Sequence, residues 1–225
     1  MLKKPGELQS IPEPVLVCFA VREEARYFIT ALARDDDRVR VLTTGMGPAN
    51  ADLKLGMALA VRRPAMVITA GFAGGLNPKL VAGQVAFEAD PETGLVERLA
   101  RSGGISGCFY CAERVAVSVA DKAGLRKSTG ADAVEMESGI IRKVCRAAGI
   151  PSATVRVISD AANEDLPLDF NAVMTRDYRI NYVRLGWTVA THPWKIPALL
   201  RFQKQTSRAA EKLARVLIGA LGIKG

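Results

Sequence analysis

The sequence predicts a single α/β domain, built as a three-layer α/β/α sandwich around a mixed, mostly parallel central sheet. Short continuous apolar runs alternate with segments of helical spacing, and short links join them. Such runs are typical of strands that are buried on both faces, and their alternation with helices favours parallel pairing. The chain has 225 residues, enough for one sizeable core and too few to argue for two.

The first half of the chain alternates strand and helix. Apolar runs predict strands at 15–20, 39–43 and 66–70. Helical spacing predicts helices at 22–33 and 49–61, the second ended by Pro64. The segment 71–75 holds three glycines in five residues, and we expect a turn there.

The second half follows the same logic, although residues 91–111 give no clear pattern. Further strands are predicted at 84–88, 114–119, 131–136 and 154–158. Helices are predicted at 121–129 and 137–148, and 159–170 is expected to be an acidic loop. The remainder is predicted to be helical. We interpret residues 1–13 as a flexible leader and 14–225 as the domain.

The basic charge of the protein lies in its last segment. Residues 171–225 hold ten lysines and arginines against two acidic residues, which accounts for the whole net charge of +8. Such a segment can meet nucleic acid, a membrane surface or an acidic partner. Nucleic acid is not the expected partner, because the segment lacks an aromatic stacking platform. No run of eighteen apolar residues occurs, so no membrane-spanning helix is expected.

The cysteines give little reason to expect a metal. Cys18 and Cys145 lie in apolar runs and are interpreted as small buried side chains in a reducing compartment, which favours a cytoplasmic protein. Cys108 and Cys111 form a lone C-x-x-C, and the only histidine, His192, is far away in sequence. Because zinc needs two further ligands, we expect neither a metal nor a cofactor.

Polar and glycine-rich features follow the predicted strands closely. In open α/β sheets a ligand usually binds at the carboxyl ends of the strands. That rule selects Glu23 and Glu24, 45–47, 71–75, 135–137, and Ser159 with Asp160. The sequence therefore predicts one site at one edge of the sheet.

Two glycine segments are candidates for lining that site. The segment 45–50 resembles a dinucleotide fingerprint but has Asn50 in place of the third glycine, so we do not expect NAD. Gly45 is either part of a tight turn or a ligand contact, and both readings remain open. Gly74 leaves the backbone bare beside the site. Phe72 either packs in the core or lies against an apolar ligand.

Three carboxylates and an arginine are candidates for the chemistry. Glu135 and Glu137 share one face if strand geometry persists, and a carboxylate can accept both hydroxyls of a ribose diol. Glu137 can alternatively stabilise the N-terminus of its helix. Arg156 lies in apolar sequence and needs a partner for its charge. Asp160 is either a cap or a general acid in a poorly solvated pocket.

Read in order, five segments resemble the nucleoside phosphorylase superfamily, most closely its branch of methylthioadenosine/S-adenosylhomocysteine nucleosidase-like proteins. The segments are 18–24 (CFAVREE), 44–47 (TGMG), 69–76 (TAGFAGGL), 133–138 (AVEMES) and 155–160 (VRVISD). The resemblance covers roughly residues 14–170 and implies a nucleoside phosphorylase-like fold. It also implies a homo-oligomer, with a dimer favoured.

The resemblance implies a role for each matching residue in cleaving a purine riboside. Asp160 would protonate N7 of the departing base, and Ser159 would orient it. Glu137 would hold the ribose hydroxyls, Met136 would pack on the sugar, and Glu24 would position or deprotonate the water with support from Arg156. The residue that stacks on the base is not evident, and Val119 is a guess from position alone.

Two departures bear on the nucleophile. Phe72 stands where the best-known nucleosidases carry a serine near the water and the sugar. The early glycine-rich phosphate segment of the phosphorylases is not seen after the first strand. Hydrolysis is therefore favoured over phosphorolysis, in which phosphate would be a co-substrate. The alternatives are a phosphate-dependent purine nucleoside phosphorylase and a non-catalytic nucleoside-binding module.

Residues 181–225 form a predicted basic amphipathic tail. Apolar residues recur at helical spacing opposite a face with Arg201, Lys204, Arg208, Lys212 and Arg215. The helix either packs on the body or touches anionic lipid at the inner face of a membrane, since Trp187 and Trp194 precede it. The tail resembles hopanoid-associated phosphorylase-like proteins, which implies an adenine nucleoside with a modified 5′ group, such as a lipid-linked adenosine.

Overall fold

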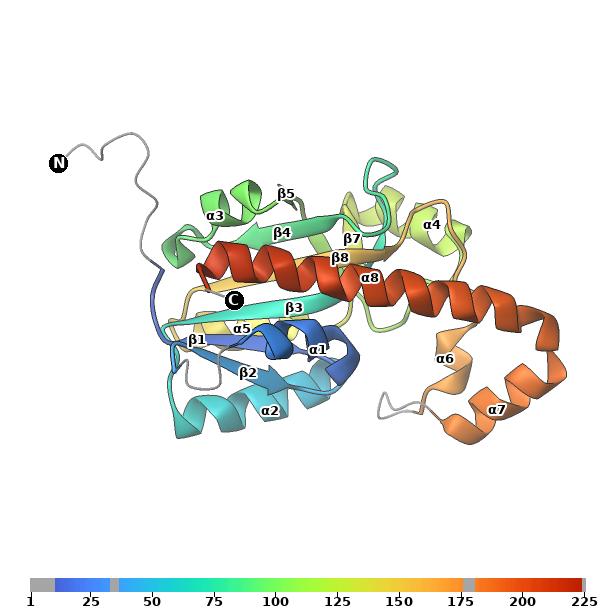
Figure 1. Cartoon of the computed structure of the whole chain (residues 1–225), viewed down its shortest axis with the longest axis horizontal. Coiled ribbons are helices and arrows are strands. Elements are labelled where there is room, and N and C mark those ends of the chain that lie inside the picture. The colour runs from blue at the N-terminus through green and yellow to red at the C-terminus, as the bar shows by residue number, and fades with distance from the viewer. Residues whose placement is uncertain (1–10, 33–36, 176–180, 224–225) are drawn as a thin grey trace.

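The computed structural model describes residues 11–32, 37–175 and 181–223 and contains an eight-stranded sheet (Figure 1). The strand order is β2-β1-β3-β8-β4-β5, and β7 pairs with both β3 and β6. Two pairs, β3–β7 and β4–β8, are antiparallel, and the other pairs are parallel. The strands are β1 (Val15–Phe19), β2 (Val39–Thr43), β3 (Met66–Gly75), β4 (Val85–Ala89), β5 (Gly104–Ser106), β6 (Phe109–Cys111), β7 (Ala133–Glu135) and β8 (Ser152–Asp160). The predicted mixed, mostly parallel sheet is confirmed.

Helices cover both faces of this sheet, which confirms the three-layer α/β/α prediction. One apolar cluster joins the sheet to α1, α3 and α8, and a second joins it to α2 and α5. The helices are α1 (Arg22–Ala31), α2 (Pro48–Val61), α3 (Val96–Arg101), α4 (Val119–Thr129), α5 (Ser138–Ala147), α6 (Phe170–Val173), α7 (Tyr182–Thr191) and α8 (Ile196–Leu221), with 3₁₀ turns η1 (Pro91–Thr93) and η2 (Pro193–Lys195).

Strand β1 shows why the central strands are apolar throughout. Val15, Val17 and Phe19 enter the cluster with α1 and α8. Leu16 and Cys18 enter the cluster with α2 and α5 on the other face. Successive side chains of a strand point to opposite faces, so a strand between two helical layers needs apolar residues at every position.

Two predictions of local structure are wrong. Residues 71–75 form the end of β3, because Gly71 to Gly74 pair with β8 and Gly74 and Gly75 pair with β7. The predicted strand 114–119 is a loop that runs into α4. Its backbone is satisfied by the segment that follows β8: Val115 exchanges hydrogen bonds with the Asn171 side chain, and the Leu166 N–H donates to the Val117 carbonyl.

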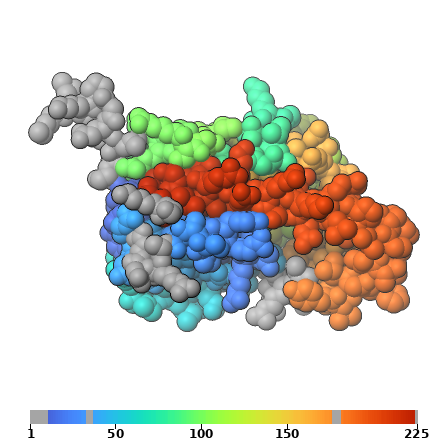
Figure 2. All heavy atoms as spheres, in the orientation of Figure 1, coloured from blue at the N-terminus to red at the C-terminus, as the bar shows by residue number. Residues whose placement is uncertain are grey.

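The two halves of α8 have different environments. From Ala209 onward the inward face of the helix is buried in the main core, with Leu213 and Leu217 fully covered. Its first half projects beyond the sheet together with α7, on which no residue is buried (Figures 1 and 2). Within the described residues, no helix is both long enough and apolar enough to cross a bilayer.

Candidate active site

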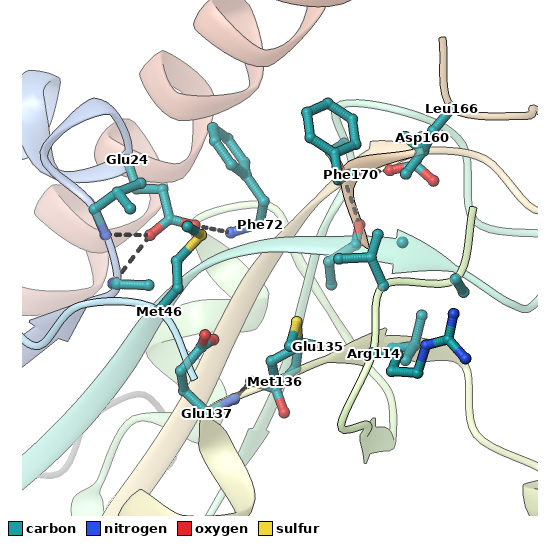
Figure 3. Close-up of a pocket in the computed structure, with 18 of the residues that line it drawn as sticks. Glu24, Met46, Phe72, Arg114, Glu135, Met136, Glu137, Asp160, Leu166 and Phe170 are labelled. Atoms are coloured by element: carbon teal, nitrogen blue, oxygen red, sulfur yellow. Dashed lines mark hydrogen bonds between the residues drawn. The ribbon is translucent and has the colours of Figure 1, made fainter. Parts of the chain in front are cut away.

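A cavity of about 230 Å³ lies at the carboxyl ends of β1, β3, β7 and β8 (Figure 3). Its polar wall is formed by Glu24, Glu135, Glu137, Ser159 and Asp160. Its apolar wall includes Met46, Phe72, Met136, Leu166, Phe170 and Phe202. Figure 3 shows Glu24 and Glu137 on one side of the cavity and Asp160 on the other. Residues far apart in the sequence thus share one cavity at the predicted edge of the sheet.

Glu24 is held rigidly by backbone donors. It lies in the first turn of α1, where its Oε2 accepts the N–H groups of Ala20 (3.0 Å) and Val21 (3.2 Å). Its Oε1 accepts the N–H of Phe72 at 2.8 Å. Burial raises the pKa of this carboxyl, although Arg156 and the three donors oppose that effect. The result is a fixed carboxylate that takes up a proton more readily than one in water.

Glu135 and Arg156 form a buried ion pair behind the cavity. An Arg156 guanidinium nitrogen, Nη2, lies 2.5 Å from Glu135 Oε2, 3.0 Å from Thr69 Oγ1 and 3.8 Å from Glu137 Oε2. Glu135 also accepts the Ser138 N–H and hydroxyl and the Glu137 N–H. Burial alone would raise the pKa of Glu135, but Arg156 and these donors hold it below its usual value. Glu135 therefore lines the cavity with both oxygens already engaged.

Gly71 allows the arginine to approach the acid of α1. A Cβ at this position would lie 2.6 Å from Glu24 Oε1 and 2.7 Å from Arg156 Nη1. Only a residue without a side chain lets these two groups come together. The glycine-rich segment thus serves the charge cluster through a close approach rather than through a turn.

Glu137 is the N-cap residue of α5, and its carboxylate reaches across to another strand's loop. Its Oε1 accepts the N–H of Gly47 at 2.9 Å. Burial raises its pKa to about 7, with Arg156 opposing and Glu135 adding to the rise. The side chain faces the cavity beside Met136 (Figure 3). The same residue therefore follows β7 closely, caps a helix and presents a carboxylate to the cavity.

Asp160 is the last residue of β8 and is engaged through both oxygens. Its Oδ1 accepts the Ser159 hydroxyl at 2.5 Å. Its Oδ2 lies 2.5 Å from the ammonium of Lys122, a lysine of α4 whose side chain is fully buried. A Cβ at Gly74 would lie 3.4 Å from the same Oδ2, so the bare backbone of β3 lies directly beside the ion pair.

Three of the predicted site residues do not line the cavity. Gly45 belongs to a tight turn, in which its N–H donates to the Ala20 carbonyl and its own carbonyl accepts the Thr44 hydroxyl. Arg156 is buried behind Glu135 and acts on the cavity through its charge. Val119 begins α4 and is 38% exposed. The path of the folded chain explains the two surface positions. The turn brings Met46 to the cavity in place of Gly45, and the loop before α4 brings Val115 and Ala116 there in place of Val119.

The structure adds residues that sequence reasoning missed. Arg114, Leu166, Phe170 and Phe202 reach the cavity from three separate segments, none of which carries a local motif, and Met46 reaches it from the segment 44–47. The rings of Phe170 and Phe202 lie 6.0 Å apart, so α6 and α8 form one apolar wall together. Lys122 has no signal either, because a lysine in a helix is normally solvated.

Among the described side chains there is no group of three or more His, Cys, Asp or Glu placed to hold a metal ion. The four cysteines are free thiols, with Cys18 and Cys145 buried as expected.

The sequence of this chain is similar to those of known proteins. The phosphorylase superfamily model matches residues 95–181. A 5′-methylthioadenosine/S-adenosylhomocysteine nucleosidase from Glaesserella parasuis serovar 5 (strain SH0165) is 26% identical over 166 residues, which is 59% of this chain and 72% of the relative.

Solved structures agree in fold over most of the chain. Futalosine hydrolase of Helicobacter pylori has a TM-score of 0.69 at 17% identity, covering 92% of this chain and 97% of that chain. A 5′-methylthioadenosine/S-adenosylhomocysteine nucleosidase from S. pneumoniae has a TM-score of 0.70 at 15% identity, covering 93% and 98%. The resemblance of this chain to the nucleoside phosphorylase superfamily is therefore confirmed, by sequence over residues 95–181 and by fold over most of its length.

Proposed function

We propose that the protein is a purine nucleosidase that uses water to cleave the N-glycosidic bond between ribose and base. The observation that carries this proposal is one cavity with an aspartate at one end and Glu24 and Glu137 at the other. A glycosidic bond is cleaved through a transition state that resembles an oxocarbenium ion. Such a reaction needs a proton for the leaving base and negative charge near the sugar. The nucleosidase relatives support the same assignment.

Each group has one task in this reaction. Asp160, oriented by Ser159, gives a proton to N7 of the base. Glu137 accepts the ribose hydroxyls, and Met136 packs on the sugar. Glu24 holds the attacking water and takes its proton. The steps need only these side chains and water, so we propose no metal and no organic cofactor.

Charge favours water over phosphate as the nucleophile. The described cation nearest to Glu24 and Glu137 is Arg156, which is already paired with Glu135. A phosphate dianion beside these carboxylates would be repelled by them, and the paired Arg156 offsets that repulsion less than an unpaired cation would. Phosphorolysis, with phosphate as co-substrate, is the alternative outcome of the experiment below.

A nucleoside panel tests the proposal directly. The purified protein is incubated with purine and pyrimidine nucleosides, with and without phosphate, and the products are separated by chromatography. We expect free purine and free ribose at a rate that does not depend on phosphate. Ribose 1-phosphate would identify a phosphorylase. Tight binding of nucleosides with no base release would identify a non-catalytic binding module.

The apolar wall supports a modified 5′ group on an adenine nucleoside. Phe72, Phe170 and Phe202 line the cavity with apolar rings, which suit an apolar substituent better than a free 5′-hydroxyl. Phe72 also lines a second hollow of about 530 Å³ between α1 and α8, which provides further space on the far side of the Phe72 ring.

A series of 5′-alkylthioadenosines of increasing chain length tests this proposal. We expect kcat/KM to rise with chain length. The variant Ser207→Trp, which blocks the hollow, should remove this rise and leave the rate on methylthioadenosine unchanged.

The projecting helices support a lipid-linked adenosine of the hopanoid type as the substrate. Tyr182, Trp187 and Trp194 are each more than two-thirds exposed. Exposed Arg184 lies in α7 with the first two, and exposed Arg201 lies in α8, which follows Trp194. Exposed aromatic rings beside cations favour peripheral contact with an anionic membrane at its inner face. Adenine release from adenosylhopane and from methylthioadenosine is compared, with anionic and neutral vesicles. A preference for methylthioadenosine would remove the lipid proposal.

A dimer is supported by a second apolar surface. Leu53, Met57 and Val61 recur every four residues on α2 and are 62%, 58% and 82% exposed. Such a stripe on one helix face fits a self-complementary interface. Light scattering after gel filtration should give twice the chain mass, and Met57→Lys should shift the protein to the monomer.

A further inference from the structure

Lys122 is a buried cation whose partners all lie around the proposed general acid. Its ammonium contacts Asp160 Oδ2 at 2.5 Å, the Ala161 carbonyl at 2.8 Å and the Glu164 carbonyl at 2.5 Å. Two of these contacts are hydrogen bonds to backbone carbonyls, and the third is an ion pair with the carboxylate. The lysine side chain is therefore held in one position by partners on three sides.

The surrounding structure is built to deliver this side chain. Helix α4 starts at a capping box between Ser118 and Asp121, which fixes the turn that carries Lys122. The Glu164 carboxylate accepts the Ala161 N–H at 3.0 Å and so closes the loop around the ammonium. A buried charge is costly unless it is paired, so an ordinary surface lysine would not be placed here.

We propose that Lys122 is a positioning residue for Asp160, which stabilises the carboxylate that forms when Asp160 gives up its proton. This inference rests on the proposed function. The lysine does not touch the substrate, because it is not among the residues that line the cavity. It acts on the reaction only through the oxygen atom that it holds.

The proton balance of the step shows where this charge is needed. The C1′–N9 bond breaks and leaves its electron pair on the base, while N7 takes the proton from the Asp160 carboxyl group. The water oxygen bonds to C1′ and passes a proton to Glu24. Asp160 becomes negative as the bond breaks, and the adjacent ammonium stabilises that developing charge without moving. Solvent later returns the proton from Glu24 to Asp160.

Two substrates with different leaving groups separate this role from a structural one. A purine nucleoside needs its base protonated, whereas a 4-nitrophenyl riboside releases a stable anion that needs no acid. For Lys122→Met we expect kcat on the nucleoside to fall roughly hundredfold, with KM changed less than about threefold. The rate on the nitrophenyl riboside should stay near that of the unaltered protein. Equal losses on both substrates, or no loss on either, would overturn the proposal.

Matched variants complete the test. Lys127 lies on the same helix and is exposed, so Lys127→Met should leave both rates unchanged. If Lys122→Met does not fold, the double variant Lys122→Met/Asp160→Asn replaces it. The double variant leaves no unpaired charge at this position, because both members of the ion pair become neutral side chains. That double variant should be no slower than Asp160→Asn alone, and a further loss would count against the proposal. If the unaltered protein cleaves the nitrophenyl riboside but no nucleoside, the proposed function fails instead.

Discussion

The two ends of the cavity solve the problem of buried charge in opposite ways. At the sugar end, three carboxylates, Glu24, Glu135 and Glu137, surround the single cation Arg156. At the base end, one carboxylate, Asp160, is paired with one cation, Lys122. The first end carries excess negative charge where the reaction creates positive charge. At the second end, a cation lies beside the group that must give up a proton.

The excess charge at the sugar end is shared unequally. Arg156 and the hydrogen-bond donors of Glu137 and Ser138 hold the pKa of Glu135 below its usual value. Burial instead raises the pKa of Glu24, and it raises the pKa of Glu137 to about 7. One carboxylate therefore neutralises the arginine, and the other two remain available to water and to hydroxyl groups. A position beside the cavity therefore does not by itself show that an acid is available to a ligand.

The base end should show the largest effect on rate. Asp160→Asn keeps the shape of the side chain but removes the proton donor. We expect kcat to fall by a factor of about 10² to 10⁴, the usual contribution of general acid catalysis. Single-turnover base release measures it, with nucleoside binding as the control. A variant that keeps more than a tenth of the rate would show that Asp160 is not the general acid of the base end.

Arg156 should matter most for folding. Arg156→Met leaves Glu135 buried without its cation, which costs about 3–5 kcal/mol when one partner of such a pair is removed. Urea unfolding should report this loss. Arg142→Met is the control, because its partners Glu88 and Asp90 are 39% and 34% exposed; its loss should be much smaller. Equal losses in the free energy of unfolding would mean that the buried pair of Arg156 and Glu135 stabilises the fold no more than an exposed pair does.

The raised pKa of Glu137 should make stability depend on pH. Its native pKa of about 7 exceeds the ordinary value of 4.5, so the folded state binds this proton more tightly than the unfolded chain does. The contribution, roughly 3 kcal/mol, is complete below pH 4.5 and disappears as the pH rises through about 7. The stability difference between the unaltered protein and Glu137→Gln should fall over this range. A constant difference would contradict the raised pKa.

Glu137 should have a smaller effect on substrate binding. An ionised carboxylate accepts both ribose hydroxyls, whereas glutamine accepts one and is neutral. We expect Glu137→Gln to raise KM roughly tenfold to hundredfold, and the KM of the unaltered protein to fall as the pH rises through about 7. A substrate without the 2′-hydroxyl provides the control, because it should lose much of the difference. If both substrates respond equally, Glu137 does not bind the diol.

Much of this arrangement could be predicted from local sequence. Strands buried on both faces need apolar residues at every position, so β1, β3 and β8 were evident from their composition. The segments 133–138 and 155–160 end such strands in acids, which pointed to Glu137 and Asp160. The predictions of a turn at 71–75 and a strand at 114–119 were wrong because the backbone partners of both segments are distant in sequence. Residues 71–75 pair with β8 and β7. The loop at 114–119 forms hydrogen bonds with Asn171 and Leu166.

The amino-acid sequence by itself determined the layers of the fold, the edge of the sheet that carries the site and the acids at that edge. Only the tertiary structure decided which acids remain available to a ligand. It paired Glu135 with Arg156, brought Lys122 from α4 to Asp160, and joined Phe170 to Phe202 as a wall. The reason is physical: apolar periodicity is local, whereas the energy of a buried charge depends on partners that only the folded chain brings within reach.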